Sequence, residues 1–251
     1  MTRILVTGSN DGIGAEIAAE LARQGHDVIR HARNAERASG LSGEVVLGDL
    51  ASLESTREMA AAVRALGAPE VVVHNAGTGT DETTRPVTGD GLERLFQINA
   101  LAPLLLTALL PVPRRSVFVS SDSIVRGNIR LDDLQHAKGW TGDAAYADSK
   151  LVMAALAFAL ARKWPGSLIN AVHPGWVSTK MSGYAAPLTV AEGADTPVWL
   201  AVSEDPEAVV SGRFFQKRAV VNLNEQAYAT DVQDKLLAQC LELAGASLPD
   251  A

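Results

Sequence analysis

The chain has 251 residues, a length typical of one α/β domain, and 47% of them are hydrophobic, which is enough for a sizeable core. Its formal net charge of −7 argues against nucleic acid or an anionic membrane as a partner, because both need a basic face. The single cysteine, Cys240, excludes an internal disulfide and a cysteine-based zinc site.

The chain carries no sign of export or of a membrane span. Its start, MTRILVTGSN, holds only a short apolar run, and its longest apolar stretch, ALAPLLLTALL, is too short to cross a bilayer. With one thiol expected to be reduced, we expect a cytoplasmic protein. The five histidines do not cluster and no His/Asp/Glu spacing suggests a metal ligand set, so we expect no metal site.

Short apolar strands alternate with longer helical segments. We expect strands at 3–7, 26–32, 44–50, 70–77, 116–121, 167–175 and 213–216, and helices at 13–25, 52–66 (capped by Ser52), 91–110 (bent at Pro103), 144–164, 189–203 and 225–244. The strands are runs of Val, Ile and Leu rather than alternating patterns, which is typical of a parallel sheet covered on both faces. The sequence therefore predicts a single-domain, doubly wound (Rossmann) α/β fold over residues 1–251, with a parallel sheet of about seven strands.

A glycine-rich turn follows the first strand. TGSNDGIG (7–14) places Gly8, Gly12 and Gly14 where the first helix opens. Glycine lets the backbone turn tightly and approach a pyrophosphate, whose charge is met by the amides at a helix N-terminus. The spacing is G-x-x-x-G-x-G rather than the G-x-G-x-x-G of many dinucleotide folds, and a tight turn alone could require it.

Two later strands also end in small or polar residues. Asp49 could accept a hydrogen bond from an adenine amino group, and Asn75, Ala76 and Gly77 form the next such end. Because the carboxyl ends of parallel strands converge on one crevice, packing alone does not explain three such loops. We therefore predict a bound dinucleotide.

The end of the second strand bears on which dinucleotide is bound. The stretch RHARN offers Arg33, with Arg30 and Arg37 nearby, where an NAD-binding protein would carry a carboxylate for the ribose diol. A guanidinium suits a 2′-phosphate, so we favour NADP over NAD. Arg33 as a solvated surface residue is the alternative, and Asp11 adds no second cation.

Tyr146 and Lys150 in YADSK lie one helical turn apart and can point into one pocket. A free tyrosine has a pKa of about 10, too high for acid–base work at neutral pH, and a neighbouring ammonium together with an oxidised nicotinamide would lower it. Ser121, at the end of the fifth strand, could hold a substrate oxygen. Ser120 and Ser123 compete for that role.

On these motifs the chain resembles the short-chain dehydrogenase/reductase family over essentially its whole length. The motifs are TGSNDGIG (7–14), Asp49-Leu50, NAG (75–77), Asn99 in FQINA, Ser121 in VFVSS, YADSK (146–150) and HPGWVST (173–179). The resemblance implies that Tyr146 is the acid–base residue, that Lys150 lowers its pKa and binds the ribose, that Ser121 orients the substrate, and that Asn99 supports a proton relay through water. Asn99 as a purely structural residue stays open.

The same resemblance implies a set of cofactor-binding residues, with Tyr146 and Lys150 among them. The others are Gly8, Ser9, Asn10, Gly12, Ile13, Gly14, Arg33, Asp49, Leu50, Asn75, Ala76, Gly77, Pro174, Gly175, Val177 and Thr179.

The long segment between Ser121 and Tyr146, with GNIRLDDL, resembles the branch that includes retinol dehydrogenases. The Asn99-Ala100 pair departs from the Asn-His of that branch and the C-terminal half matches loosely, so we do not infer a retinoid substrate. We expect substrate loops near 121–143 and 176–197. Apolar residues within them indicate a carbonyl or alcohol substrate with apolar surface, namely Trp140, Trp176, Met181 and Tyr184.

The sequence thus favours an NADP-dependent oxidoreductase that transfers a hydride between nicotinamide and a carbonyl or secondary alcohol. Two alternatives are a dinucleotide-binding regulator with little turnover and a sugar-nucleotide epimerase or dehydratase, although only about seventy residues follow Thr179 for a substrate domain. A homo-oligomer through the helices at 91–110 and 144–164 is possible. His136, in the insertion, could face the substrate, but we favour a position at the surface.

Overall fold

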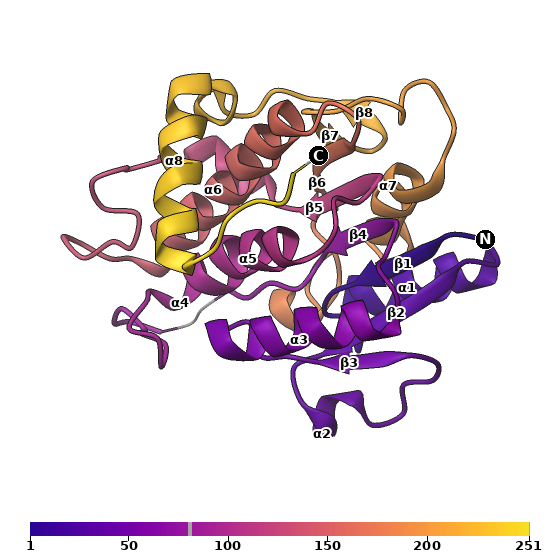
Figure 1. The fold of residues 1–251 in the computed structure, drawn as a ribbon. Helices are drawn as coiled ribbons and strands as arrows, with labels where there is room; N and C mark the ends of the chain where they lie inside the picture. Colours follow the sequence, from indigo (N-terminus) through magenta and orange to yellow (C-terminus); the bar gives the residue numbers. More distant parts are fainter. Residues whose placement is uncertain (80–81, 251) are drawn as a thin grey trace.

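The computed structural model describes residues 1–79 and 82–250. An eight-stranded sheet in the order β3-β2-β1-β4-β5-β6-β7-β8 forms its centre (Figure 1). The strands are β1 (Arg3–Val6), β2 (Asp27–Ala32), β3 (Val45–Leu47), β4 (Val71–His74), β5 (Arg115–Val119), β6 (Leu168–His173), β7 (Phe214–Gln216) and β8 (Ala219–Val220). All pairs are parallel except β7 with β8. The predicted doubly wound fold is confirmed, and the short antiparallel β8 is the strand that the sequence did not reveal.

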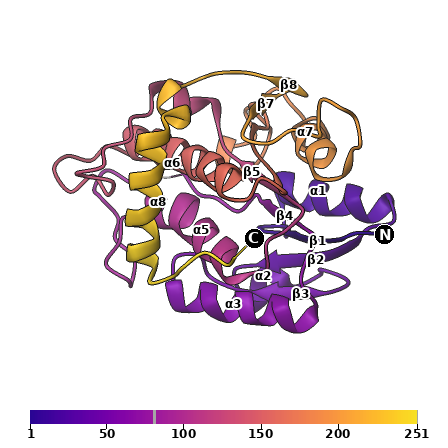
Figure 2. The same ribbon diagram turned by 45° about the horizontal axis from the view of Figure 1, so that its top comes forward.

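Helices cover both faces of the sheet. On one face lie α1 (Gly12–Arg23) and α7 (Val190–Val202), and on the other lie α3 (Leu53–Leu66), α5 (Ala102–Leu109) and α6 (Gly142–Lys163) (Figure 2). Residues of β1 alternate between these layers, since Ile4 and Val6 pack with Ile17 whereas Leu5 packs with Met59. The central strands β4 and β5 are buried at every position, including the polar residues His74, Arg115 and Ser116 at their ends.

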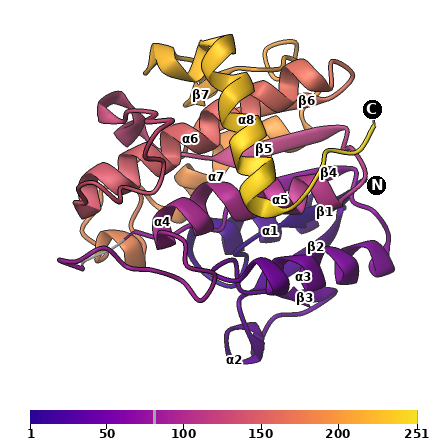
Figure 3. The ribbon, with the colours of Figure 1, turned by 60° about the vertical axis from the view of Figure 1, so that its left-hand side comes forward.

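The C-terminal helix α8 (Thr230–Ala244) lies across α5 and α6, outside the layer that they form (Figure 3). Leu236, Leu237 and Cys240 join the cluster built around the buried residues of α6. The helix α6 is long and apolar enough to cross a membrane by length and composition, but 89% of its apolar window is buried inside the protein. Its composition is therefore explained by packing between the sheet and α8.

The segment predicted as one helix at 91–110 has three parts. The short α4 (Arg94–Phe96) leads into a π-helical turn at Gln97–Leu101, and α5 follows. Pro103 lies in the first turn of α5, where a missing N–H is tolerated, so the irregularity precedes the proline that was expected to cause it. The predicted cap at Ser52 is present, because its side chain accepts a hydrogen bond from the Ser55 amide at 3.2 Å.

Candidate active site

The glycine turn lies at the carboxyl edge of the sheet, between β1 and α1. Gly8 and Gly12 adopt left-handed φ values of 63° and 57°. A Cβ on Gly8 would lie 2.9 Å from the Ala76 Cα, and one on Gly14 would lie 2.2 Å from the Gly8 carbonyl oxygen and 2.3 Å from the Asn75 side-chain nitrogen. The turn thus requires glycine and leaves the first amides of α1 facing the crevice, which suits a pyrophosphate.

Gly14→Ala tests this cradle. Glycine-to-alanine changes inside a helix normally stabilise by about 1 kcal/mol, but here the added methyl has no space. We expect a loss of stability on the order of 3 kcal/mol together with loss of cofactor binding. Urea unfolding and fluorescence titration with NADPH measure the two effects. The control is Gly166→Ala, where nothing lies within 4 Å of the added carbon. Equal stability and equal cofactor affinity of the two variants would contradict the close contacts around Gly14.

Side chains from neighbouring strands brace the turn. The Asn75 side chain donates to the Thr7 and Gly8 carbonyl oxygens at 3.0 and 3.2 Å. His31 on β2 accepts from the Gly8 amide through Nδ1 at 2.9 Å, which leaves its Nε2–H to donate to the Gly48 carbonyl at 2.8 Å. Burial lowers the pKa of His31 and keeps it neutral. This bracing role of His31 was not predicted from the sequence, because His31 and Gly8 belong to different elements.

Two residues predicted to meet the adenosine flank the turn. Asp49 follows β3, where its carboxylate accepts from the Ala51 amide at 2.9 Å, and the next residue, Leu50, is buried. Arg33 is exposed at the end of β2 and makes no hydrogen bond or ion pair within the described part of the chain. Arg37, by contrast, is paired with Asp11 at 3.4 Å. Arg33 is therefore the arginine at this end that is available to a ligand.

Lys150 and Asn99 converge on Gly77. A Cβ on Gly77 would lie 3.0 Å from the Lys150 Nζ and 3.1 Å from the Asn99 Oδ1, so glycine is needed here too. Lys150 is only 4% exposed and donates to the Val119 carbonyl at 3.0 Å, and burial lowers its pKa to about 8. Gly77 is thus the point at which the end of β4 meets the π-helical turn and α6.

Asn99 lies in the π-helical turn at Gln97–Leu101, where the regular hydrogen-bond pattern of an α-helix is interrupted. Its Oδ1 accepts from the Thr78 amide at 2.8 Å, and its Nδ2 donates to the Thr78 carbonyl and to the Ser149 hydroxyl, both at 3.0 Å. These bonds fix the loop after β4 against α6. The structural role therefore exists, and it leaves the predicted role in a water relay as a proposal.

Tyr146 lies one turn before Lys150 on α6, and the two share the carboxyl edge with Ser121. Burial raises the pKa of Tyr146, the Asp122 charge raises it further, and a hydrogen bond from Ser121 and the charge of Arg126 lower it. In the protein alone Lys150 does not produce the lowering that we expected, because desolvation of the phenol outweighs the other effects.

The three serines after β5 have different surroundings. The Ser120 hydroxyl is buried and donates to the Lys150 carbonyl at 2.9 Å, and Ser123 is buried as well. Ser121 is partly exposed; its hydroxyl accepts from the Ser123 amide at 3.1 Å and interacts with Tyr146. Ser121 is thus the serine that reaches the phenol.

The loop after β6 closes the other side of the crevice. Gly175 has a φ of 92° after Pro174, and Val177 is buried against Leu188. Thr179 reaches the glycine turn, since a Cβ on Gly12 would lie 3.5 Å from its methyl group. The remaining residues predicted to bind the cofactor line the start of α1 (Ser9, Asn10 and Ile13), while Ala76 donates its amide to the Thr7 hydroxyl at 3.0 Å.

Large apolar side chains are exposed on this loop. Trp176, Met181 and Tyr184 are 61%, 58% and 64% exposed, and Met181 lies against Gly79. Trp140 is half-buried and its indole N–H donates to the buried Glu93 carboxylate at 3.2 Å. The exposed group belongs to one of the two predicted substrate loops, whereas Trp140 is fixed within the other.

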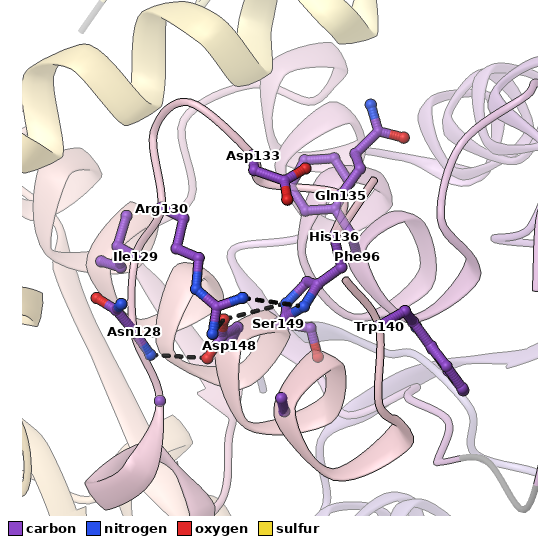
Figure 4. Close-up of polar contacts among 12 residues, drawn as sticks. Phe96, Asn128, Ile129, Arg130, Asp133, Gln135, His136, Trp140, Asp148 and Ser149 are labelled. Atoms are coloured by element: carbon purple, nitrogen blue, oxygen red, sulfur yellow. Dashed lines mark hydrogen bonds and ion pairs between the residues drawn. The ribbon is translucent and has the colours of Figure 1, made fainter. Parts of the chain in front are cut away.

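The prediction that His136 lies at the surface is wrong. The side chain is 3% exposed, and its Nε2 lies 3.0 Å from the Asp148 Oδ2 on α6 (Figure 4). No sequence pattern indicates this contact, because residues 136 and 148 lie in different elements. Within residues 1–79 and 82–250, no group of three or more His, Cys, Asp or Glu side chains could hold a metal ion.

A doubly wound fold with a glycine cradle at the carboxyl edge, beside a tyrosine and a lysine one turn apart, is that of a nucleotide-dependent oxidoreductase. The chain belongs to the short-chain dehydrogenase family, whose model matches residues 2–187. Accordingly, it is an NAD(P)-dependent enzyme of this family.

Relatives of this chain are similar to it over most of their length. An uncharacterised oxidoreductase of Emericella nidulans is 35% identical over 99% of both chains, and retinol dehydrogenase 13 of Homo sapiens is 31% identical over 98% of this chain and 83% of its own. A putative uncharacterised protein from Mycobacterium paratuberculosis has a TM-score of 0.83 with 28% identity, over 99% of this chain and 95% of its own. A blue fluorescent protein from a metagenomic library, in complex with NADPH, has a TM-score of 0.68 with 26% identity, over 85% and 95%.

Proposed function

We propose that the protein is an NADP-dependent reductase that moves a hydride to the carbonyl carbon of a small molecule with apolar surface, and that the reverse oxidation is the disfavoured direction. The convergence of Tyr146, Ser121 and Lys150 at the edge that holds the glycine cradle carries this proposal. The bound nicotinamide would supply the hydride. The proposal treats residues 1–251 as one cofactor-binding domain and places the enzyme in the cytoplasm.

Each protein group has a defined task in this proposal. Tyr146 donates its phenolic proton to the substrate oxygen; its raised pKa keeps it protonated at neutral pH, which suits an acid in reduction. The Ser121 hydroxyl orients that oxygen. Lys150 would bind the cofactor ribose from its buried position beside Gly77, and Asn99 would hold the loop after β4 in place.

The exposed group Trp176, Met181 and Tyr184 supports a substrate with apolar surface. Exposed apolar side chains beside a polar crevice are typical of a binding site for a ligand of mixed character.

A homo-oligomer through 91–110 and 144–164 would have to form over α8, which covers α5 and α6. The protein need not associate in order to bury those helices.

Purified protein mixed with NADPH and a panel of ketones, aldehydes and quinones tests the proposal. For the panel members that carry apolar rings or chains, we expect the NADPH absorbance at about 340 nm to fall when the substrate is added. About one NADPH should be oxidised for each carbonyl reduced. Cofactor binding without turnover across the whole panel would instead favour a regulatory protein.

Arg33→Ala tests the choice of cofactor. Loss of a charge-assisted contact to the 2′-phosphate should weaken NADPH binding by about 10-fold or more and leave NADH binding unchanged. Titration of both cofactors measures this. Arg23→Ala, on the exposed far end of α1, is the matched control. An equal effect of Arg33→Ala on both cofactors would show that Arg33 does not read the phosphate.

A further inference from the structure

The segment between Ser121 and Tyr146 is tied to the helix that carries Tyr146. It leaves the sheet at Ser121 and returns to α6 just before Tyr146, so residues proposed for catalysis flank it at both ends. At its start, a Cβ on Gly127 would lie 2.9 Å from the Ala147 carbonyl oxygen, so the backbones nearly touch. Residues 127–141 are the central part of the first of the two predicted substrate loops, and from here on "the substrate loop" means these residues alone.

Asp148 is the centre of a buried polar cluster that faces this loop. It is 6% exposed, and its Oδ1 accepts from the Asn128 amide at 2.7 Å. Its Oδ2 lies 3.0 Å from the His136 Nε2 and 3.6 Å from the Arg130 guanidinium. The three side chains point toward one another in Figure 4. One carboxylate on α6 therefore holds three separate points of the substrate loop.

Only one tautomer of His136 fits the groups that surround it in this cluster. An Arg130 nitrogen lies 3.3 Å from the His136 Nδ1, and since a guanidinium can only donate, Nδ1 accepts. The imidazole hydrogen is therefore on Nε2, facing Asp148. Neither the Asp148 Oδ2 nor the His136 Nε2 has a hydrogen-bond partner among the described residues, so their approach to 3.0 Å is the one polar contact that either atom makes within the cluster besides the Arg130 guanidinium near Oδ2.

The backbone of His136 adopts a conformation that a residue with a side chain would not prefer on its own. His136 has a φ of 54°, in the left-handed region that residues with a side chain rarely adopt. Such a conformation persists where the surroundings fix it, and it concentrates at ligand-binding segments. The Arg130 side chain is 37% exposed, so its pairing with Asp148 adds little net stability, and the effect of the cluster is to select one arrangement of the chain.

We propose that Asp148 is a positioning residue that fixes the substrate loop against the turn of α6 between Tyr146 and Lys150, and that the enzyme thereby discriminates between carbonyl substrates by shape. The other end of the loop is fixed independently, because Gln135 accepts from the Glu93 amide at 3.0 Å and Trp140 donates to the Glu93 carboxylate. The anchored loop is a rigid wall rather than a mobile lid. This inference rests on the proposed reductase function.

Asp148→Asn is the test variant. The new amide can still accept from the Asn128 amide, but it loses the charge that faces Arg130 and would set an N–H against the His136 Nε2–H. The control is Asp132→Asn, which removes an exposed ion pair with Lys138 from the same loop. A second variant, His136→Asn, tolerates the left-handed backbone and is too short to reach Asp148.

Two measurements on the full chain decide the matter. We expect Asp148→Asn and His136→Asn each to speed amide hydrogen exchange within 127–141 by about 10-fold or more, while β4 and β5 exchange as in the wild type. The kcat/KM ratio of a bulky apolar ketone to a small one should change by about 5-fold or more, with NADPH affinity unchanged. The double variant should match the single ones, because one cluster is broken.

If amide hydrogen exchange within 127–141 is no faster in Asp148→Asn than in Asp132→Asn, the inference is overturned. This outcome does not depend on which substrate the enzyme reduces. Faster exchange throughout the sheet would also overturn it, since Asp148 would then serve only global stability. If the loop is freed but the selectivity ratio stays constant, Asp148 does not govern substrate choice. Failure of the proposed function has a different signature, namely no carbonyl turnover by the wild type with either cofactor.

Discussion

Tyr146→Phe is expected to abolish carbonyl reduction and to leave cofactor binding intact. The change removes one hydroxyl, the proton donor in the proposed reaction, and retains the ring that packs in the site. Loss of a positioned acid typically costs about 10²–10⁴-fold in rate, so kcat should fall by at least that much. Initial rates with NADPH and a fluorescence titration of NADPH measure the two quantities.

The matched control is Tyr228→Phe. Tyr228 stacks on Phe158 with ring centroids 4.8 Å apart, and it lies on the segment before α8. Loss of the Tyr228 hydroxyl should leave kcat within a factor of about two of the wild-type value. Substantial activity in Tyr146→Phe would show that another group supplies the proton, and equal losses in both variants would point to a general effect of losing a tyrosine hydroxyl.

Lys150→Met should inactivate the enzyme and make the cofactor-free protein more stable at neutral pH. Lys150 is 4% exposed, and among the described residues its ammonium has one hydrogen-bond acceptor, the Val119 carbonyl, so burial disfavours its charge. A methionine of similar length removes that cost. We expect a gain on the order of 1–3 kcal/mol at pH 7 and a loss of kcat/KM of at least about 10²-fold.

The gain should depend on pH in a defined direction. The folded pKa of Lys150 is about 8 and its ordinary value is 10.5, so between these values the unfolded chain binds more protons than the folded one. Wild-type stability from this group therefore rises with pH across that window. The advantage of Lys150→Met should be full below pH 8 and shrink toward pH 10.5. Urea unfolding at pH 7 and pH 9.5 measures it, and a less stable variant at pH 7 would contradict a costly burial.

The parts of the site that sequence predicts well are local. The glycine turn follows from the strand before it and the helix after it, and the spacing of Tyr146 and Lys150 follows from helical geometry. Apolar periodicity also predicts the order of strands and helices, and the predicted ends differ from the observed ones by a few residues. The choice of Ser121 over Ser120 was an open alternative, and the contact of Ser120 with the Lys150 carbonyl now explains why it is not free.

The parts that sequence missed depend on contacts between distant segments. His31 braces the glycine turn from another strand, and His136 is buried because Asp148 lies opposite it on α6. The residues next to a histidine in the sequence do not indicate which distant segment it will contact in the fold. The raised pKa of Tyr146 is likewise a result of burial, which the four-residue spacing to Lys150 does not encode. The very short α2 (Ala35–Ala38) and β8 are too brief to give a periodic signal.

The most direct test of the account is a crystal structure of the wild-type protein with NADP⁺. The account predicts the pyrophosphate on the amides of the glycine turn at 7–14, the 2′-phosphate beside Arg33, and the nicotinamide C4 facing the Tyr146 hydroxyl across a gap of about 3–4 Å left for the substrate carbon. A nicotinamide ring bound away from Tyr146 and Lys150, or a crevice closed to it by the loop after β6, would contradict the account.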